Sequence, residues 1–294
     1  MHPAHGRGDA VSPALRPLLD LDAHPVVAHR GASGYAPENT IPAFELGVAQ
    51  GADALELDVH LTADDVPIVI HDPRLERTTD LTGAVAELAL RRVREADAGA
   101  RFTPDGGGTF PYRGRGVRVP TLDEVLAAFT GLPIVIEVKS VRAQAAAMRV
   151  ILDHGAQGRC IVASAEGAAV RLFRAPGWVT GACSSEIARL RFALPGFGAR
   201  SVPYQAIFAP PSSRGVPVLT RGFVRAARRL GVPVHAWTVN DAEGARELWA
   251  RGVSGIITNY PDRILAARAA LSGAGEPRPS SPGASGDRSG GTGI

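Results

Sequence analysis

Lysine is almost absent from this sequence. Of the 32 lysine and arginine residues, only Lys139 is a lysine, and asparagine occurs only at Asn39, Asn240 and Asn259. Where arginine is used almost everywhere, a single ammonium group indicates a position that arginine does not fill, because the two side chains differ in shape and hydration. Lys139 is therefore a candidate functional residue.

Other features that the sequence lacks argue against whole classes of protein. No run of 18 apolar residues occurs, so we expect no stable insertion into a membrane. Residues 1–24 are polar and interrupted by proline, unlike a secretory signal. The formal net charge is only +3, without a block of like charges, so we expect no nucleic-acid partner. The two cysteines, Cys160 and Cys183, lie in apolar stretches and are expected to be reduced, which fits the cytoplasm.

The central part of the chain alternates short runs rich in valine and isoleucine with segments of helical spacing. Eight such runs without a polar face are typical of buried parallel strands. A closed (β/α)8 TIM barrel fits this number and a length of roughly 250 residues better than an open sheet. No G-x-G-x-x-G motif opens the first helix, which disfavours a dinucleotide-binding fold. The expected strands are 26–29, 54–59, 134–138, 160–163, 178–182, 204–208, 234–239 and 255–258.

The composition divides the chain into three parts. Residues 24–271 form the predicted barrel, residues 1–23 a flexible segment, and residues 272–294 a disordered tail of glycine, serine, proline and arginine. Within the barrel, residues 72–119 have no clear period and follow the second strand. Long irregular segments in compact folds are often functional, so we expect this insertion to lie over the active site.

A ninth strand-like run, residues 67–71, follows the second strand too closely for a parallel crossover. We therefore expect a hairpin above the rim of the barrel. Its return brings His71 back beside Leu57 and Asp58.

Carboxylates gather at the predicted carboxyl ends of the strands, where the active sites of such barrels lie. Glu56 and Asp58 are two residues apart and share one face of their strand, and Glu137 ends the fourth strand. Three anions this close need a compensating positive charge. An all-oxygen ligand set suits one divalent cation, Mg²⁺ or Ca²⁺. The alternative is that each carboxylate is a solvated or ion-paired residue of the rim.

Two histidines belong to the same group of residues. His29 ends the first strand and His71 ends the hairpin return, and such a pair can act as acid and base near neutral pH. The alternative is that each is a hydrogen-bonded structural residue. His60, on the same strand face as Glu56 and Asp58, is the one competitor.

Arg30 and Lys139 bring positive charge to the same rim. A guanidinium and an ammonium beside a cation make a site for an anion with several oxygens, such as phosphate. Trp237, near the end of the seventh strand, is either a wall of the pocket or a core residue.

The ordered set of motifs resembles the glycerophosphodiester phosphodiesterase family over roughly residues 26–267. The segments that carry the resemblance are 29–40 (HRGASGYAPENT), 56–59 (ELDV), 67–72 (PIVIHD), 119–122 (VPTL), 137–139 (EVK), 236–240 (AWTVN) and 255–258 (GIIT). An insertion after the second strand is also a feature of the family. Asn259 stands where the family usually has aspartate, and residues 189–211 fit the family pattern poorly.

The resemblance implies a metal-dependent enzyme that cleaves small glycerophosphodiesters to an alcohol and glycerol 3-phosphate. It implies that the cation binds to Glu56, Asp58 and Glu137. It further implies His29 and His71 as general base and acid, and Arg30 and Lys139 as phosphate ligands.

Two other functions stay open. The same barrel could cleave lysophospholipids or phosphoinositides, which an apolar patch on the 72–119 insertion would favour. That insertion is rich in glycine and arginine and offers no such patch. The second alternative is a barrel that binds phosphorylated ligands without catalysis, which would require the loss of a metal ligand or a histidine.

Overall fold

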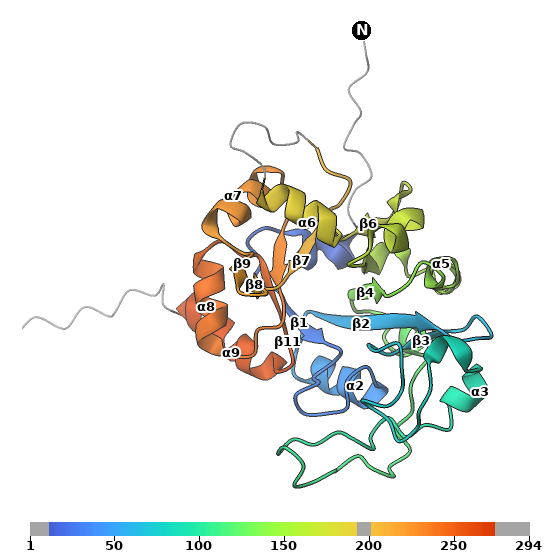
Figure 1. Ribbon diagram of the computed structural model, residues 1–294. Helices are drawn as coiled ribbons and strands as arrows, with labels where there is room; N and C mark the ends of the chain where they lie inside the picture. The colour runs from blue at the N-terminus through green and yellow to red at the C-terminus, as the bar shows by residue number, and fades with distance from the viewer. Residues whose placement is uncertain (1–11, 193–200, 274–294) are drawn as a thin grey trace, which may run out of the picture.

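The computed structural model describes residues 12–192 and 201–273, which form a ring of strands surrounded by helices (Figure 1). Eight parallel strands follow the order β6-β5-β4-β2-β1-β11-β10-β7. A parallel bridge between Gly181 and Ala206 links the end of β6 to the residue before β7 and closes the ring. The predicted (β/α)8 barrel is therefore confirmed.

The barrel strands begin close to the predicted positions. β6 and β10 end two and three residues earlier than predicted, and β2 and β7 end two and one residues later. The strands are β1 (Val26–His29), β2 (Ala54–Leu61), β4 (Ile134–Val138), β5 (Cys160–Ala163), β6 (Val179–Thr180), β7 (Ile207–Ala209), β10 (Val234–Ala236) and β11 (Gly255–Thr258). A further hairpin, β8 (Ser212–Ser213) and β9 (Val216–Pro217), was not expected from the sequence.

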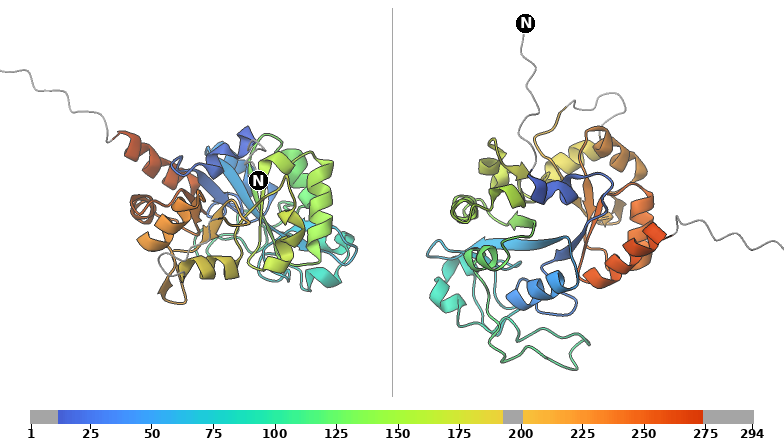
Figure 2. Two further views of the ribbon diagram at one scale, coloured as in Figure 1. Left: turned by 90° about the horizontal axis from the view of Figure 1, so that it is seen from above. Right: turned by 180° about the vertical axis from the view of Figure 1, so that it is seen from behind.

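The helices pack around the outside of the ring, as Figure 2 shows from above and from behind. Side-chain caps fix several of their starts: Thr121 and Glu124 form a capping box, and Asp241 accepts a hydrogen bond from the Gly244 amide. The helices of the ring are α2 (Ile41–Ala49), α4 (Leu122–Ala128), α5 (Ala143–Asp153), α6 (Ser184–Arg191), α7 (Arg221–Arg229), α8 (Ala242–Ala250) and α9 (Pro261–Gly273). In the part of the chain that the structure describes, no helix is long and apolar enough to span a bilayer.

The register of the parallel strands brings the functional residues to one level. His29 on β1 pairs with Glu56 on β2, and Asp58 on β2 pairs with Glu137 on β4. Because all these strands run in one direction, the residues meet at the carboxyl end of the barrel.

The predicted hairpin is present as β3 (Pro67–Val69), antiparallel to β2. Val69 pairs with Val59, and the Ile70 amide donates to the Asp58 carbonyl over 3.0 Å. This register carries His71 to the level of Asp58, as the sequence predicts.

The prediction that residues 1–23 form a flexible segment is wrong for residues 13–19, which the structure describes as helical. Residues 13–19 form η1 (Pro13–Leu15) and α1 (Arg16–Leu19), and Leu15 and Leu18 are buried. They pack with Val27, Val135 and Ile257 inside the barrel. An open barrel end would expose these apolar side chains to water, so the two leucines are needed to bury them. Residues 1–11 lie outside the described residues.

The 72–119 insertion has a small apolar core of its own. It contains η2 (Val85–Glu87) and α3 (Leu90–Val93), and the side chains of Leu75, Val85 and Val93 are buried together with Ile68 of β3. The predicted tail, 272–294, lies outside the described residues from position 274 onward, and α9 continues to Gly273.

Candidate active site

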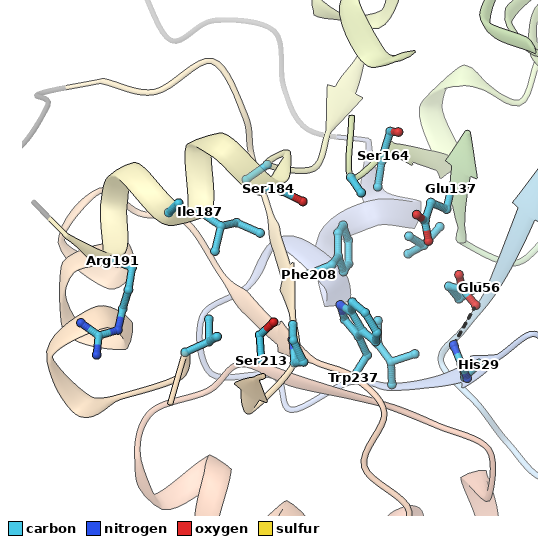
Figure 3. Close-up of a pocket in the computed structure, with 18 of the residues that line it drawn as sticks. His29, Glu56, Glu137, Ser164, Ser184, Ile187, Arg191, Phe208, Ser213 and Trp237 are labelled. Atoms are coloured by element: carbon cyan, nitrogen blue, oxygen red, sulfur yellow. Dashed lines mark ion pairs between the residues drawn. The ribbon is translucent and has the colours of Figure 1, made fainter. Parts of the chain in front are cut away.

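His29 is held in one orientation at the end of β1. Its Nδ1 donates to Asn259 Oδ1 over 2.7 Å, and the Ser33 hydroxyl donates to the same amide oxygen over 3.0 Å. The other ring nitrogen, Nε2, faces Glu56 Oε2 at 4.0 Å (Figure 3). Burial and the neighbouring charge of Arg30 lower the pKa of His29 to about 4. At neutral pH the ring is therefore uncharged, with a free lone pair on Nε2.

Asp58 is buried at the centre of the site. Asn39 Nδ2 donates to its Oδ2 over 2.8 Å, and Lys139 Nζ lies 2.7 Å from its Oδ1. Burial acts to raise the pKa of Asp58, but the charges of Lys139 and Arg30 outweigh it and lower the pKa. Asp58 is therefore an ionised carboxylate in an apolar barrel.

Glu56 and Glu137 complete a group of three carboxylates with Asp58. Each offers an oxygen, and the three oxygens lie within 4.8 Å of one another. Glu137 also contacts Lys139 Nζ at 2.8 Å. Burial and the charge of Asp58 raise the pKa of Glu56 well above its usual value.

The carboxylate group fits a hard divalent cation. Three convergent carboxylate oxygens are the donors that Mg²⁺ and Ca²⁺ prefer. Burial is the main cause of the raised pKa of Glu56, and the charges of Asp58 and Glu137 add to it despite the opposing charges of Arg30 and Lys139. A bound cation would supply further positive charge.

His71 is oriented by a chain of charged groups. Its Nδ1 lies 2.6 Å from Asp72 Oδ1, and Arg77 Nε donates to Asp72 Oδ2 over 2.6 Å. Arg77 also donates to both oxygens of Glu38, which accepts a further hydrogen bond from Arg30. The hydrogen bonds from Arg77 lower the pKa of Asp72 below its usual range. The His71 side chain is 35% exposed, so the ring is accessible to a substrate.

The backbone of Arg30 is turned to bring its side chain into the site. Arg30 adopts a φ of 56° and Gly31 a φ of 82°, both in the left-handed region. A Cβ at position 31 would lie 2.4 Å from the carbonyl carbon of Ala43, so only glycine fits there. Arg30 Nε lies 3.0 Å from Asp58 Oδ2, but it is buried without a hydrogen bond in the described structure. Nε therefore faces the buried carboxylate of Asp58, while the Arg30 side chain lines the cavity.

A cavity of about 680 Å³ opens beside these residues. His29, Arg30, His71 and Lys139 line one side of it, with Glu56 and Glu137. The opposite side is formed by α6, the β8–β9 hairpin and the loop after β10, and it is mostly apolar. Its residues include Ile187, Phe208, Val216, Pro217 and Trp237 (Figure 3).

The structure therefore brings all eight predicted site residues to one cavity or its floor. Trp237 is 40% exposed and lines the wall, so it is not a core residue. Asp58 is buried beneath the cavity rather than in its wall. The competitor His60 uses Nε2 to contact the His71 carbonyl at 3.0 Å and is absent from the cavity wall among the described residues. We interpret His60 as a support for the hairpin.

Four residues that support the site had no role assigned from the sequence: Glu38, Asn39, Asp72 and Arg77, which hold the catalytic candidates in place. Asn259, noted from the sequence as a departure from the family pattern, orients His29. Glu38, Asn39 and Asp72 lie inside the motifs that carry the family resemblance, so their positions were a usable signal. Arg77 is one of many arginines, and nothing in the sequence distinguishes it.

The 72–119 insertion contacts the site through Asp72 and Arg77. None of the described residues in the cavity wall comes from positions 72–119. The far wall comes from residues 184–192 and 208–218 instead, which include the two ends of the segment that fits the family pattern poorly.

Fold and side chains place the protein among the (β/α)8-barrel hydrolases of phosphoric diesters, and comparisons with known proteins give the family. The profile of the Glycerophosphoryl diester phosphodiesterase family matches residues 29–263. The chain is 35% identical over 249 residues to a putative glycerophosphodiester phosphodiesterase, YhdW, of Bacillus subtilis, covering 82% of this chain and 96% of that protein. The chain belongs to the glycerophosphoryl diester phosphodiesterase family.

Experimental structures of related proteins agree with this assignment. A glycerophosphodiester phosphodiesterase from Agrobacterium tumefaciens superposes with a TM-score of 0.67 at 27% identity, covering 83% of this chain and 99% of that one. An Oleispira antarctica phosphodiesterase, in complex with the product sn-glycerol-3-phosphate, superposes with a TM-score of 0.66 at 25% identity, covering 83% and 96%.

Proposed function

We propose that the protein hydrolyses glycerophosphodiesters to an alcohol and glycerol 3-phosphate, with a divalent cation and an acid–base pair of histidines. The observation that carries this proposal is the meeting of His29, His71 and three carboxylates at one cavity beside Arg30 and Lys139. The Oleispira relative is in complex with the product sn-glycerol-3-phosphate, and this supports glycerol 3-phosphate as the phosphate ester that is released.

His29 is suited to be the base of the first step. Its Nδ1 hydrogen is committed to Asn259, and its Nε2 is unprotonated at neutral pH. We propose that Nε2 takes the proton of the substrate's glycerol 2-hydroxyl as that oxygen forms a bond to phosphorus. His71, whose Nδ1 is held by Asp72, donates a proton from Nε2 to the leaving alcohol as the old P–O bond breaks. Water then opens the cyclic phosphate with the two roles reversed.

The charged residues act on the phosphate during both steps. The guanidinium of Arg30 and the ammonium of Lys139, which both line the cavity, neutralise charge that grows on the phosphate oxygens. Glu56, Asp58 and Glu137 would hold the cation, which when bound supplies Lewis-acid stabilisation of the same oxygens. Glu38 and Arg77 keep Arg30 and His71 at a fixed separation.

A second candidate function is favoured by the apolar wall of the cavity. Ile187, Phe208 and Val216 offer contacts to an aliphatic group on the diester, which small polar headgroups would not use. Lysophospholipids and related diesters are therefore a second substrate class, although the patch lies on residues 187–218 and not on the 72–119 insertion.

The test is release of glycerol 3-phosphate from glycerophosphocholine and glycerophosphoethanolamine with Mg²⁺, with Ca²⁺ and with chelator. We expect that release requires a cation and that His71→Ala lowers it about 1000-fold. Release that persists in chelator would contradict the role of the carboxylates. No release from either diester, with release from lysophosphatidylcholine, would make the second candidate the leading one.

We also propose a reducing compartment, the cytoplasm. Cys160 and Cys183 are both buried and free, and burial raises the pKa of the Cys160 thiol to about 12. A thiol that stays protonated and inaccessible gives no sign of a role in disulfide exchange.

A further inference from the structure

One long segment of the chain carries only positive charge. From residue 187 to residue 240 there is no aspartate and no glutamate, whereas the whole chain has 29 of them. The same segment contains eight arginines, at positions 189, 191, 200, 214, 221, 225, 228 and 229. The far wall of the cavity and helix α7 lie in this segment.

Several of these arginines are free to meet a ligand. Arg228 is paired with Asp22, but Arg189, Arg214, Arg221 and Arg225 have no carboxylate within 4.0 Å among the residues that the structure describes. All four are exposed. Arg221 and Arg225 are four residues apart on α7, so they lie on one face, opposite the buried Phe223, Val224 and Ala227.

Exposed apolar side chains lie beside this positive charge. Phe192 is 71% exposed and Val216 is 51% exposed, and both also reach the cavity wall. Their segments are adjacent, because Arg191 Nε donates to the Pro217 carbonyl over 3.2 Å. Helix α6 in turn contacts α7. Phe192, Val216, Arg189, Arg214, Arg221 and Arg225, which we call the arginine rim, therefore lie on three adjacent elements, and Arg221 and Arg225 also line a groove between α7 and the end of α8.

The arginine rim lies across the ring from the 72–119 insertion, near α6 and α7 in Figure 1. Side chains of this kind are what a peripheral membrane protein presents to lipid. Aromatic and aliphatic tips enter the headgroup region, and arginines attract the phosphates of anionic lipids. Phe192 is the one residue of the arginine rim whose ring could stack on a base, whereas single-stranded nucleic acid is bound by successive aromatic rings, which favours a lipid surface.

We propose that the arginine rim is a docking surface for a bilayer that contains anionic phospholipids. Docking there is peripheral, because only two apolar tips are exposed, and it is reversed by salt. It places the open, apolar side of the cavity next to the membrane that is the source of glycerophosphodiesters. The attachment does not depend on the catalytic roles proposed above.

The experiment is co-sedimentation of the full chain with two kinds of vesicle, one of phosphatidylcholine alone and one of phosphatidylcholine mixed with phosphatidylglycerol, because anionic lipid gives a membrane a negative surface potential. We expect the protein to bind only to the anionic vesicles and to dissociate from them at a NaCl concentration on the order of 0.5 M. Arg214→Gln/Arg221→Gln/Arg225→Gln should weaken binding roughly 100-fold, given the typical contribution of each arginine near an anionic surface. Phe192→Ser/Val216→Ser should weaken it further at moderate salt.

The matched control is Arg91→Gln/Arg115→Gln/Arg118→Gln, which removes the same charge from the insertion on the other side of the ring. We expect the control to bind anionic vesicles nearly as well as the unchanged protein. Hydrolysis of a water-soluble diester and thermal melting should be unaffected in both arginine triples, which shows that they fold.

Three results would overturn the proposal. One is no binding to anionic vesicles, and another is equal binding to neutral ones. The third is an equal loss in the two arginine triples, which would show that only net charge matters. Tighter binding of an oligonucleotide, lost in the rim triple alone, would assign the surface to nucleic acid instead. A protein that hydrolyses no diester but binds vesicles would refute the proposed function and leave the docking surface standing.

Discussion

On the side of the cavity built by β1, β2 and β4, the functional side chains are held by other side chains. Asn39 and Lys139 both contact Asp58, and Asp72 contacts His71. On the side built by α6 and the β8–β9 hairpin, Ile187 faces the cavity with an apolar side chain (Figure 3), and Val216 also lines the cavity there. Bond making and breaking at phosphorus require catalytic groups in fixed positions, whereas the leaving alcohol requires space. We infer that the first side carries out the reaction and that the second side accommodates the leaving alcohol.

The sharpest test of this comparison is the removal of one histidine. His71→Ala should lower kcat about 1000-fold, because acid–base catalysis is typically worth roughly 10²–10⁴. Phe208→Ala on the other side should cost less than about tenfold, since it removes packing and no proton transfer. Glycerol 3-phosphate release measures both. His154→Ala, whose ring contacts only Asp123 in the described structure, is the control. Equal losses on the two sides would show that the division is false.

The next test concerns the carboxylates. Glu56→Gln removes one of the three negative charges and should weaken binding of Mg²⁺ or Ca²⁺ about 100-fold, by analogy with the loss of residues that support metal sites. Isothermal titration with each cation measures the change. Glu45→Gln, an exposed carboxylate on α2, should bind as the unchanged protein does. If Glu56→Gln bound the cation normally, the three carboxylates would not be its ligands.

Asn259 gives a smaller effect with a defined pH dependence. Asn259→Leu removes the acceptor that lies 2.7 Å from His29 Nδ1, leaving only the Thr238 hydroxyl at 3.5 Å in the described structure, and should lower kcat about tenfold, roughly the value of one hydrogen bond. Asn259→Asp instead adds a negative charge beside the ring, which raises the pKa of His29 from about 4. A base must be unprotonated, so the acidic limb of the profile of kcat against pH should move to higher pH. A profile that does not move would show that His29 is not the base.

The smallest effects are expected at the apolar wall. Ile187→Ser should raise KM severalfold for a diester with an aliphatic leaving group and leave kcat unchanged, because burial of a few methylene groups is worth roughly 1–3 kcal/mol. Inhibition by glycerol 3-phosphate should stay the same, since the product occupies the other side. Ser164→Ala, also in the wall, is a control for substitution without loss of apolar surface. A change in product inhibition would show that the two sides are coupled.

The sequence predicted the chemical side of the cavity well, for a physical reason. Parallel strands place their carboxyl ends at one edge, so His29, Glu56 and Glu137 could be brought together from strand positions alone. The hairpin return of His71 followed from a connection too short for any other pairing. Neither step required knowledge of a loop.

The remaining features depend on loop geometry or on packing between distant segments. The contact of Arg77 with Glu38 joins residues 39 positions apart, and the contact of His29 with Asn259 joins residues 230 apart. No sequence pattern distinguishes the residues of the apolar cavity wall from residues of the core, because Ile187 and Phe208 are as hydrophobic as any buried residue. Leu15 and Leu18 are too short a pair to predict a helix that closes the barrel.

The burial of Leu15 and Leu18 has a consequence for the order of folding. The Leu18 carbonyl accepts a hydrogen bond from His235 Nε2, 217 positions later in the chain, and β1 pairs directly with β11. These contacts cannot form until nearly the whole barrel has been synthesised. During translation the apolar side chains of the first segments therefore remain exposed. They become buried only when the ring finally closes.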